Sequence, residues 1–465
     1  MTIPNREIRL GIALIPVLFL MSALAVGIIL FKQLPHIPLI LATAVAATVA
    51  LLHGFSWKHI REGAIHGILI AMDAVLILLI VGTMIGTWIL GGIVPTMIYY
   101  GLKILSPSIF LIATLLICSI VALGTGSSWS TAGTVGVALI GIGRGLGIPV
   151  SMVAGAIISG AYFGDKLSPL SDTTNLAPAV AGSDLFGHIR HMIYTTIPGY
   201  VLAIILFGLI GIRFSASNLD TKNIELMLSA MDRVFFIHPI LLLPPCLVVF
   251  MVIKRTPPLP ALFAGTLLGA LCALLAQSAT FSEVIQAAFS GYTSQTGLAM
   301  MDTLLTRGGL MNMMETVALI YCALAFGGVM EKTGMLEIFA KSLLKRVHRT
   351  GSLIATTLFS CVCINAIAPN QYMSIVIPGR MYRNKFKELG LHPVNLSRCL
   401  EDAGTLSSPL IPWNSCGAFM HATLGVNPIF YLPYAFLNLA TPIVSMIYGY
   451  TGVTITKEKN PIKTK

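Results

Sequence analysis

The chain has 465 residues, of which 56% are hydrophobic and only 10% are charged, and its formal net charge is +11. Soluble proteins average about 25% charged residues, so most of this chain does not face water. The basic residues lie in short connections between apolar runs, which is the positive-inside pattern of membrane proteins and argues against a nucleic-acid partner.

About ten apolar runs are long enough to cross a bilayer, beginning with residues 10–31. This first run is too long for the core of a signal peptide, and we interpret it as a retained span. The runs are also too long for buried β-strands, and no polar helix faces alternate with them. The sequence therefore predicts an all-α polytopic membrane protein embedded in the lipid bilayer.

The chain contains an internal repeat. Residues 57–67 resemble residues 280–291, and residues 72–92 resemble residues 314–334, with spacings that differ by 18 residues. This difference predicts an insertion around residues 292–311. Further on, GTGSSWST matches INAIAPNQ, and SPL matches a second SPL, both at a spacing of 240 residues. We assign a first inverted repeat to residues 1–212, an extramembrane linker to 213–235, and a second inverted repeat with a basic cytoplasmic tail to 236–465.

The basic connections predict the topology. If all of them are cytoplasmic, residues 351–379 must enter and leave the membrane on the same side. This segment is too short for two full spans of ~20 residues each, so it predicts a re-entrant helical hairpin. Residues 107–143 would form the equivalent hairpin from the other side. Each half then has about five transmembrane helices plus one hairpin, the second half is inverted, and both termini are cytoplasmic.

Four polar stretches interrupt the apolar runs, and they contain the prolines and glycines that break helices: residues 124–131, 164–175, 365–371 and 401–415. Broken backbone at membrane depth survives only when it is buried in protein or lines a wet cavity. One such break would favour a simple proline kink. Four breaks in symmetric pairs instead favour a central binding site between broken helices at the midplane.

Two carboxylates within the second break are the strongest candidates for cation and proton binding. An Asp at mid-membrane costs ~2.5–3.5 kcal/mol on insertion scales, so Asp165 and Asp172 require a partner or a wet site. Close carboxylates raise each other's proton affinity, so binding of Na⁺ would expel H⁺. Lys166 leaves an alternative open, because its ammonium could form a structural ion pair with one of these acids.

Neutral oxygens near the breaks would complete or mirror a Na⁺ site at Asp165 and Asp172. The candidates are Ser168, Thr173, Thr174 and Asn175 beside the two acids, Ser127, Ser128, Ser130 and Thr131 in the first hairpin tip, and Asn365, Asn370, Gln371, Ser408 and Asn414 in the second half.

Further acids are secondary candidates. Asp73 and Glu315 form a symmetric pair by the repeat, although an interfacial position is the alternative for both. Asp402 follows Glu401 at the start of the last break, where pairing with Arg398 is the alternative. The histidines His188 and His191 are expected near membrane interfaces rather than in a proton relay.

The sequence gives no sign of an enzyme. It contains no P-loop motif for ATP and no serine or cysteine nucleophile in a catalytic setting, so we expect no cofactor and no ATP-driven transport.

Several of these motifs also resemble a known family. GSSWSTAGTVGVALIGIGRGLGIP and AGAIISGAYFGDKLSPLSDTTNLAPAVAG in the first half, and NQYMSIVIPGRMYR and LSRCLEDAGTLSSPLIPWNSCGAFM in the second, are similar to the NhaC-type Na⁺/H⁺ antiporters of the ion transporter superfamily. The resemblance implies a secondary antiporter with paired hairpins and broken helices that moves a transport domain against a scaffold. Some relatives with similar motifs exchange malate for lactate together with Na⁺ and H⁺.

The prediction is therefore a Na⁺/H⁺ antiporter of the cytoplasmic membrane. Its substrates would be Na⁺ and H⁺, with Li⁺ or an organic acid left open, and a homodimer is also left open. One alternative is a Na⁺-coupled organic-acid antiporter, in which Lys166 could hold a carboxylate. A second alternative is a cation channel with re-entrant hairpins.

Overall fold

The computed structural model describes residues 8–31, 33–215, 221–344, 347 and 349–458. Within these ranges the chain is helical and forms no β-strand, only two isolated β-bridges. Six helices are long and apolar enough to span a membrane: α4 (Met72–Leu90), α6 (Pro107–Thr125), α11 (Leu185–Ser215), α14 (Pro258–Ala276), α17 (Met314–Lys332) and α19 (Thr350–Ile367). The all-helical, multi-pass membrane architecture expected from composition is therefore confirmed.

Other apolar helices are shorter or bent. Helix α12 (Thr221–Val234) meets α13 (Leu243–Ile253) at 97°, and α23 (Pro428–Tyr431) meets α24 (Phe436–Thr451) at 60°. If each bent pair counts as one span, the described residues contain up to eight spans. The remaining helices outside the breaks are α1 (Leu10–Ala25), α2 (His36–Leu52), α3 (Trp57–Leu69), α5 (Ile93–Ile104), α15 (Phe281–Ser290), α16 (Ala299–Leu305) and α18 (Met335–Leu344).

Each polar stretch contains a helix break. The breaks separate α6 from α7 (Ser128–Thr131), α9 (Val150–Leu167) from α10 (Asp172–Ala181), α19 from α20 (Gln371–Glu388), and the π-helical turn η5 (Leu400–Thr405) from α22 (Ser415–Leu424). Two further helices flank them, α8 (Val137–Gly145) and α21 (Pro393–Cys399). Gly126 permits the first break, because its φ of +66° is a left-handed conformation that side chains disfavour.

The breaks recur in the two halves at a constant spacing. Helix α6 begins at residue 107 and α19 at 350, α9 begins at 150 and α21 at 393, and α10 begins at 172 and α22 at 415, always 243 residues apart. The spacing of 240 that the SPL motif indicates is three residues short. The first SPL lies in a four-residue break, whereas the second forms a 3-10 turn within a longer one, so the two motifs are not structurally equivalent.

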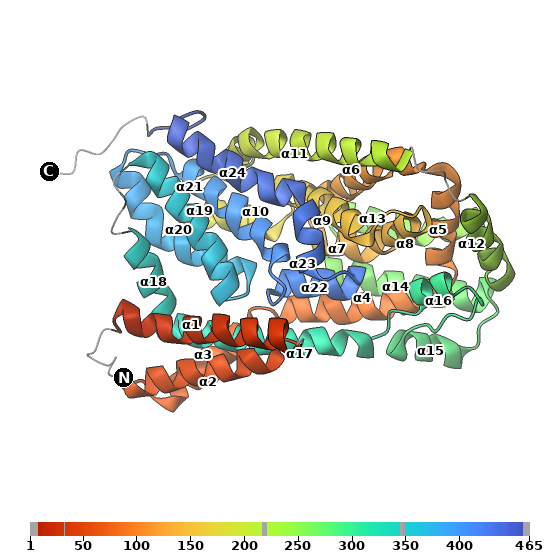
Figure 1. The fold of residues 1–465 in the computed structure, drawn as a ribbon, viewed down its shortest axis with the longest axis horizontal. Coiled ribbons are helices and arrows are strands. Elements are labelled where there is room, and N and C mark those ends of the chain that lie inside the picture. The colour runs from red at the N-terminus through yellow and green to blue at the C-terminus, as the bar shows by residue number, and fades with distance from the viewer. Residues whose placement is uncertain (1–7, 32, 216–220, 345–346, 348, 459–465) are drawn as a thin grey trace.

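The core positions the breaks near the middle of the molecule. Helix α9 packs along α6, and the contact is so close at Gly164 that a Cβ there would lie 2.4 Å from the carbonyl oxygen of Ser119. Small residues permit this approach of membrane helices. Figure 1 shows α11 along one edge, α1 to α3 along the opposite edge, and α9, α10 and α22 between them.

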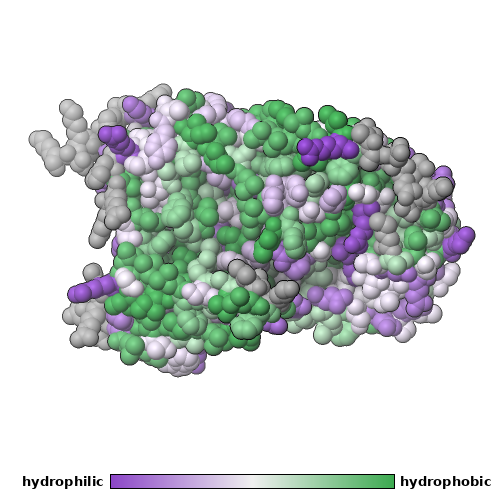
Figure 2. Space-filling view, in the orientation of Figure 1, coloured by the Kyte–Doolittle hydropathy of each residue, from purple (hydrophilic) through white to green (hydrophobic). Residues whose placement is uncertain are grey.

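The surface agrees with a membrane environment. Many large hydrophobic side chains of α11, α13 and α14 are exposed, among them Leu209, Phe250 and Phe263. Figure 2 shows hydrophobic side chains over much of one face, with many hydrophilic ones towards the end that carries α12, α15 and α16. Figure 1 also shows that α1 begins and α24 ends at the same end of the molecule.

The predicted linker and tail fall partly outside the described residues. Helix α11 continues to Ser215, residues 216–220 are not among those described, and α12 then packs on α5, where Tyr99 donates a hydrogen bond of 3.1 Å to Asp232. The predicted insertion around 292–311 contains α16. Of the basic tail, Lys457 is described and residues 459–465 are not.

Candidate functional site

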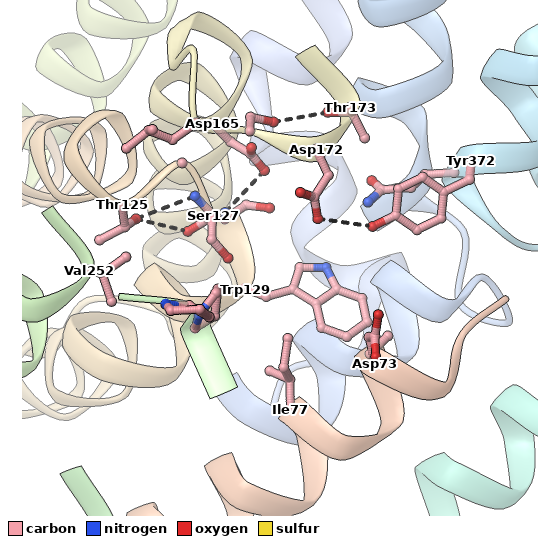
Figure 3. Close-up of a pocket in the computed structure, with 18 of the residues that line it drawn as sticks. Asp73, Ile77, Thr125, Ser127, Trp129, Asp165, Asp172, Thr173, Val252 and Tyr372 are labelled. Carbon is pink, nitrogen blue, oxygen red and sulfur yellow. Dashed lines mark hydrogen bonds between the residues drawn. The ribbon is translucent and has the colours of Figure 1, made fainter. Parts of the chain in front are cut away.

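A cavity of about 400 Å³ lies where four helices begin. It is lined by Ser127–Trp129 at the start of α7, Ser171–Thr173 at the start of α10, Asn370–Tyr372 at the start of α20, and Ser415 at the start of α22. Residues of the α3–α4 junction and of the α13–α14 connection close the remaining sides (Figure 3). Helix N-termini carry partial positive charge, which offsets part of the cost of placing carboxylates on this wall.

Two acids from the second break face this cavity. Asp165 lies in the last turn of α9 and is only 8% exposed, and its Oδ2 accepts a hydrogen bond of 3.0 Å from the backbone N–H of Ser128. Asp172 is the first residue of α10 and is exposed, and the hydroxyl of Tyr372 donates to its Oδ2 at 3.5 Å. Figure 3 shows both carboxylates in the same part of the cavity, and they interact electrostatically.

Neither carboxylate forms an ion pair within the described part of the chain. Asp165 and Asp172 therefore keep oxygens that a cation or a proton can bind. Asp73, at the start of α4, adds a third acid to the cavity wall and is exposed.

Five of the predicted neutral ligands also line the cavity: Ser127, Ser128, Thr173, Asn370 and Gln371. Two of them begin helices. The Oγ of Ser127 accepts from the N–H of Ser130 at 3.1 Å, and the Oδ1 of Asn370 accepts from the N–H of Tyr372 at 2.8 Å. Their capping bonds fix the helix ends that face the cavity. Thr173 shares a hydrogen bond of 3.2 Å with Ser171.

The other predicted ligands from the first half lie behind the cavity wall and shape the breaks. Ser168 accepts from the N–H of Leu170 at 3.3 Å, and Thr174 donates to the carbonyl of Lys166 at 3.0 Å. Asn175 donates to the carbonyl of Pro169 at 2.9 Å. Ser130 and Thr131 are buried, and Thr131 donates to the carbonyl of Ser127 at 2.9 Å. These residues support the site without lining it.

Asn365, Asn414 and Ser408 similarly hold the second-half breaks together. Asn365 donates to the carbonyl of Gly404 at 2.6 Å, and Asn414 donates to the carbonyl of Asn365 at 3.1 Å. Ser408 donates to Gln371 at 3.4 Å and so connects to the cavity wall.

The secondary acids occupy three different environments. Asp73 lines the cavity, whereas Glu315 is exposed at the start of α17 outside it. Asp402 is fully buried and forms an ion pair with Lys166. It also accepts a hydrogen bond of 3.1 Å from the hydroxyl of Thr195, and Nε of Arg398 lies 4.0 Å from its Oδ2.

This arrangement settles what the sequence left open for Lys166. Its ammonium pairs with Asp402, 236 residues away, and not with the neighbouring Asp165 or with Asp172. The prediction that Glu401 and Asp402 mark the start of a break was wrong. Both acids lie in the π-helical turn η5, whose backbone is still helical, and the helix continues to Ser407.

Two histidines that the sequence places near membrane interfaces are packed inside the protein. His188 and His191 are 0% and 5% exposed. The Nδ1 of His188 lies 2.9 Å from the hydroxyl of Ser397, and Nε2 of His191 lies 2.9 Å from the carbonyl of Thr454. Both rings therefore belong to the packed region around Lys166, Arg398 and Asp402.

Sequence reasoning missed many residues of the cavity wall, and three of them bear on its chemistry. Trp129, Tyr372 and Arg255 all line it, and the Trp129 ring stacks on Phe419 with centroids 4.0 Å apart. Trp129 and Tyr372 each occupy the second position of a helix that starts at a break, so their place next to a capping residue was the available signal. Arg255 was interpreted only as part of a cytoplasmic basic connection.

Comparisons with known proteins agree with this chemistry. A sequence profile described as the Na⁺/H⁺ antiporter family matches residues 160–453. The chain is 40% identical over 460 residues to the Na(+)/H(+) antiporter NhaC of Alkalihalophilus pseudofirmus, covering 98% of each chain. It is 40% identical over 448 residues to the malate-2H(+)/Na(+)-lactate antiporter of Bacillus subtilis, covering 96% of each. It is 38% identical over 452 residues to the arginine/ornithine antiporter ArcD of Halobacterium salinarum, covering 97% of this chain and 93% of that protein.

The family match includes the second half of α9 and all of α10 and α20 to α22, which together carry Asp165, Asp172 and part of the cavity wall. On the length and identity of these matches, the chain belongs to the Na⁺/H⁺ antiporter family.

Proposed function

We propose that this protein exchanges Na⁺ for H⁺ across the cytoplasmic membrane. The observation that carries the proposal is the pair Asp165 and Asp172, which face one cavity between broken membrane helices and form no ion pair with any described cationic residue. The relative from Alkalihalophilus pseudofirmus, named as a Na(+)/H(+) antiporter, supports the choice of ions.

In this proposal Na⁺ binds between Asp165 and Asp172. Hydroxyl and amide oxygens on the wall, such as those of Ser127 and Thr173, supply further ligands, since a small hard cation prefers oxygen. Removing Na⁺ leaves two neighbouring negative charges, which raises the proton affinity of the acids at and around the site. Binding of one ion therefore expels the other, and exchange follows when the loaded site opens to either side in turn.

We also infer that the two halves are inverted repeats, each with about five transmembrane helices and one re-entrant hairpin. The constant spacing of 243 residues between equivalent helix starts supports a repeat that includes the breaks. We place both termini in the cytoplasm, which is supported by the common end at which α1 begins and α24 ends (Figure 1) and by the basic residues near these ends.

The test is reconstitution of the full chain in lipid vesicles that contain a pH-sensitive dye. Addition of Na⁺ to the outside should make the interior more alkaline, because each entering Na⁺ displaces H⁺ outward. Li⁺ and K⁺ added separately would measure ion selectivity. No proton movement on addition of Na⁺ alone would overturn the proposal, and a Na⁺ current without coupled proton movement would instead indicate a channel.

A second candidate is a Na⁺-coupled exchanger of organic acids. The specific observation in its favour is Arg255, a cationic side chain on the cavity wall that could hold a carboxylate. The malate-2H(+)/Na(+)-lactate antiporter at 40% identity points the same way. Lys166, the clamp expected from the sequence, is not free for this role because it pairs with Asp402. Proton movement that requires added malate or lactate would favour this candidate.

A further inference from the structure

A fully buried acid beside the cavity has no role in the cation site. Glu401 lies in the π-helical turn η5, is 0% exposed, and neither of its carboxyl oxygens has a hydrogen-bond partner among the described residues. A buried polar group without a partner is unfavourable, and more so if it is charged. Single π-helical turns inside α-helices occur frequently at functional sites.

The cationic side chains around Glu401 already interact with its neighbour in the chain, Asp402. Lys166 forms its ion pair with Asp402, and Arg398 approaches the second oxygen of Asp402 at 4.0 Å while its Nη1 donates to the hydroxyl of Thr454 at 2.9 Å. The buried cluster of these residues is thus held together without any contribution from Glu401. Its two histidines, His188 and His191 of α11, face Lys166 and Arg398.

Two opposing influences therefore act on the proton of Glu401. Complete burial without a hydrogen bond favours the neutral carboxyl group, because an ionised one would lose its hydration. The cluster, however, contains two positive charges, Lys166 and Arg398, against the single negative charge of Asp402. This excess favours the ionised form, and the negative charge of the nearby Asp165 opposes it. A carboxyl group whose protonated and ionised forms are close in free energy can take up or release a proton after a small change in its surroundings.

Glu401 is also connected to the cavity. Its carboxyl interacts with the side chains of Thr405 and Thr173, and electrostatically with Lys166 and Asp165. Thr173 and Asp165 both line the cavity. A proton therefore has a short route from cavity water past the Thr173 hydroxyl to Glu401.

We propose that Glu401 carries the proton that is exchanged for Na⁺. This inference rests on the proposed antiport function. A proton from water on one side forms an O–H bond with the Glu401 carboxylate. Na⁺ bound at Asp165 then adds positive charge nearby, the O–H bond breaks, and the proton passes to water on the other side. One carboxylate is regenerated for each proton carried, so the step is balanced.

The test separates proton coupling from cation transport. Glu401→Gln removes the proton-binding oxygen but keeps the size and neutrality of the protonated acid. In vesicles containing the full-length variant, Na⁺-driven proton movement should fall to the level of vesicles without protein. Exchange of external radioactive Na⁺ for internal Na⁺, which needs no proton step, should continue at saturating Na⁺. Glu337→Gln is the matched control, because Glu337 is an exposed glutamate of α18 with a side chain that is 60% exposed.

The other possible results of this experiment also test the inference. Retained proton movement in Glu401→Gln overturns the inference, and so does loss of both activities in a folded variant, which would assign Glu401 to Na⁺ binding. If Glu401→Gln does not fold, Glu401→Asp keeps a carboxyl group and should retain coupling with a shifted pH dependence, whereas an unchanged pH profile overturns the inference. Absence of Na⁺-driven proton movement in the wild type would instead refute the proposed function itself.

Discussion

The two broken regions share one helix plan but hold their acids in opposite ways. In the first half, Asp165 and Asp172 face a cavity and form no ion pair with described residues. In the second half, Glu401 and Asp402 are fully buried, and Asp402 is paired with Lys166. The difference shows that the backbone plan determines where helix ends meet, while the side chains decide whether the acids of a break are paired or face a cavity.

The charges themselves do not follow the repeat. At the spacing of 243 residues, the counterpart of Asp172 is Ser415 and that of Asp402 is Ser159. Lys166 connects the two regions, since it follows Asp165 in the chain but pairs across the molecule. The ion pair therefore ties α9, which carries the cavity acid, to the second broken region.

The largest expected effect on stability is at this ion pair. Lys166→Met should destabilise the protein by about 3–5 kcal/mol, because it leaves Asp402 as a buried charge without its main partner. Thermal unfolding of the purified protein in detergent would measure the loss. Replacing both partners, as Lys166→Met with Asp402→Leu, should recover much of it, since two apolar side chains remove the unpaired charge.

Lys341→Met is the matched control for Lys166→Met. The ion pair of Lys341 with Glu337 is exposed, with side chains 64% and 60% exposed, so its loss should change the unfolding temperature little. Equal effects at Lys166 and Lys341 would mean that burial does not distinguish the second broken region.

A smaller effect is expected at the helix caps, and it should be larger in the second half. Asn414→Ala removes the cap of α22 and also the hydrogen bonds of 3.1 and 3.0 Å that Asn414 donates to Asn365. We expect a loss of about 2 kcal/mol in the free energy of unfolding, at the upper end of the range for capping residues. Thermal or denaturant unfolding would measure it.

The equivalent change in the first half should cost less. Ser171 caps α10 through one hydrogen bond of 3.4 Å to the N–H of Thr174, so Ser171→Ala should cost about 1 kcal/mol. A greater loss for Ser171→Ala than for Asn414→Ala would contradict the idea that the second broken region is the more tightly packed of the two.

Local features of the sequence were predictable, because they depend on neighbouring residues. Gly126 and the prolines identify the breaks, and Asp165 and Asp172 reach one cavity because only a four-residue break separates their helices. Positions that depend on packing between the halves were not predictable. The pairing of Lys166 with Asp402 spans 236 residues, and nothing in either local sequence indicates it.

Symmetry in the sequence was also an incomplete guide. Asp73 and Glu315 match in the repeat, yet only Asp73 lines the cavity. The segments that precede the two acids differ. Helix α4, which carries Asp73, follows α3 after two residues, whereas α17, which carries Glu315, follows the segment that contains α16. The repeat predicted the positions of the helix breaks better than it predicted which acids line the cavity.

The smallest expected effect on stability is at Asp172, where the effect on transport should be complete. Asp172 is exposed, and its side chain makes one hydrogen bond of 3.5 Å, so Asp172→Asn should change the unfolding free energy by no more than about 0.5 kcal/mol. The same change removes one of the two charges that hold Na⁺, so Na⁺-driven proton movement in vesicles should disappear.

Glu388→Gln, an exposed acid of α20 far along the helix from its break, should preserve both properties. Full activity in Asp172→Asn would remove this residue from the cation site. A stability loss as large as that of Lys166→Met would show instead that the cavity acids stabilise the fold, like Asp402. The acids of the two broken regions would then have the same structural role.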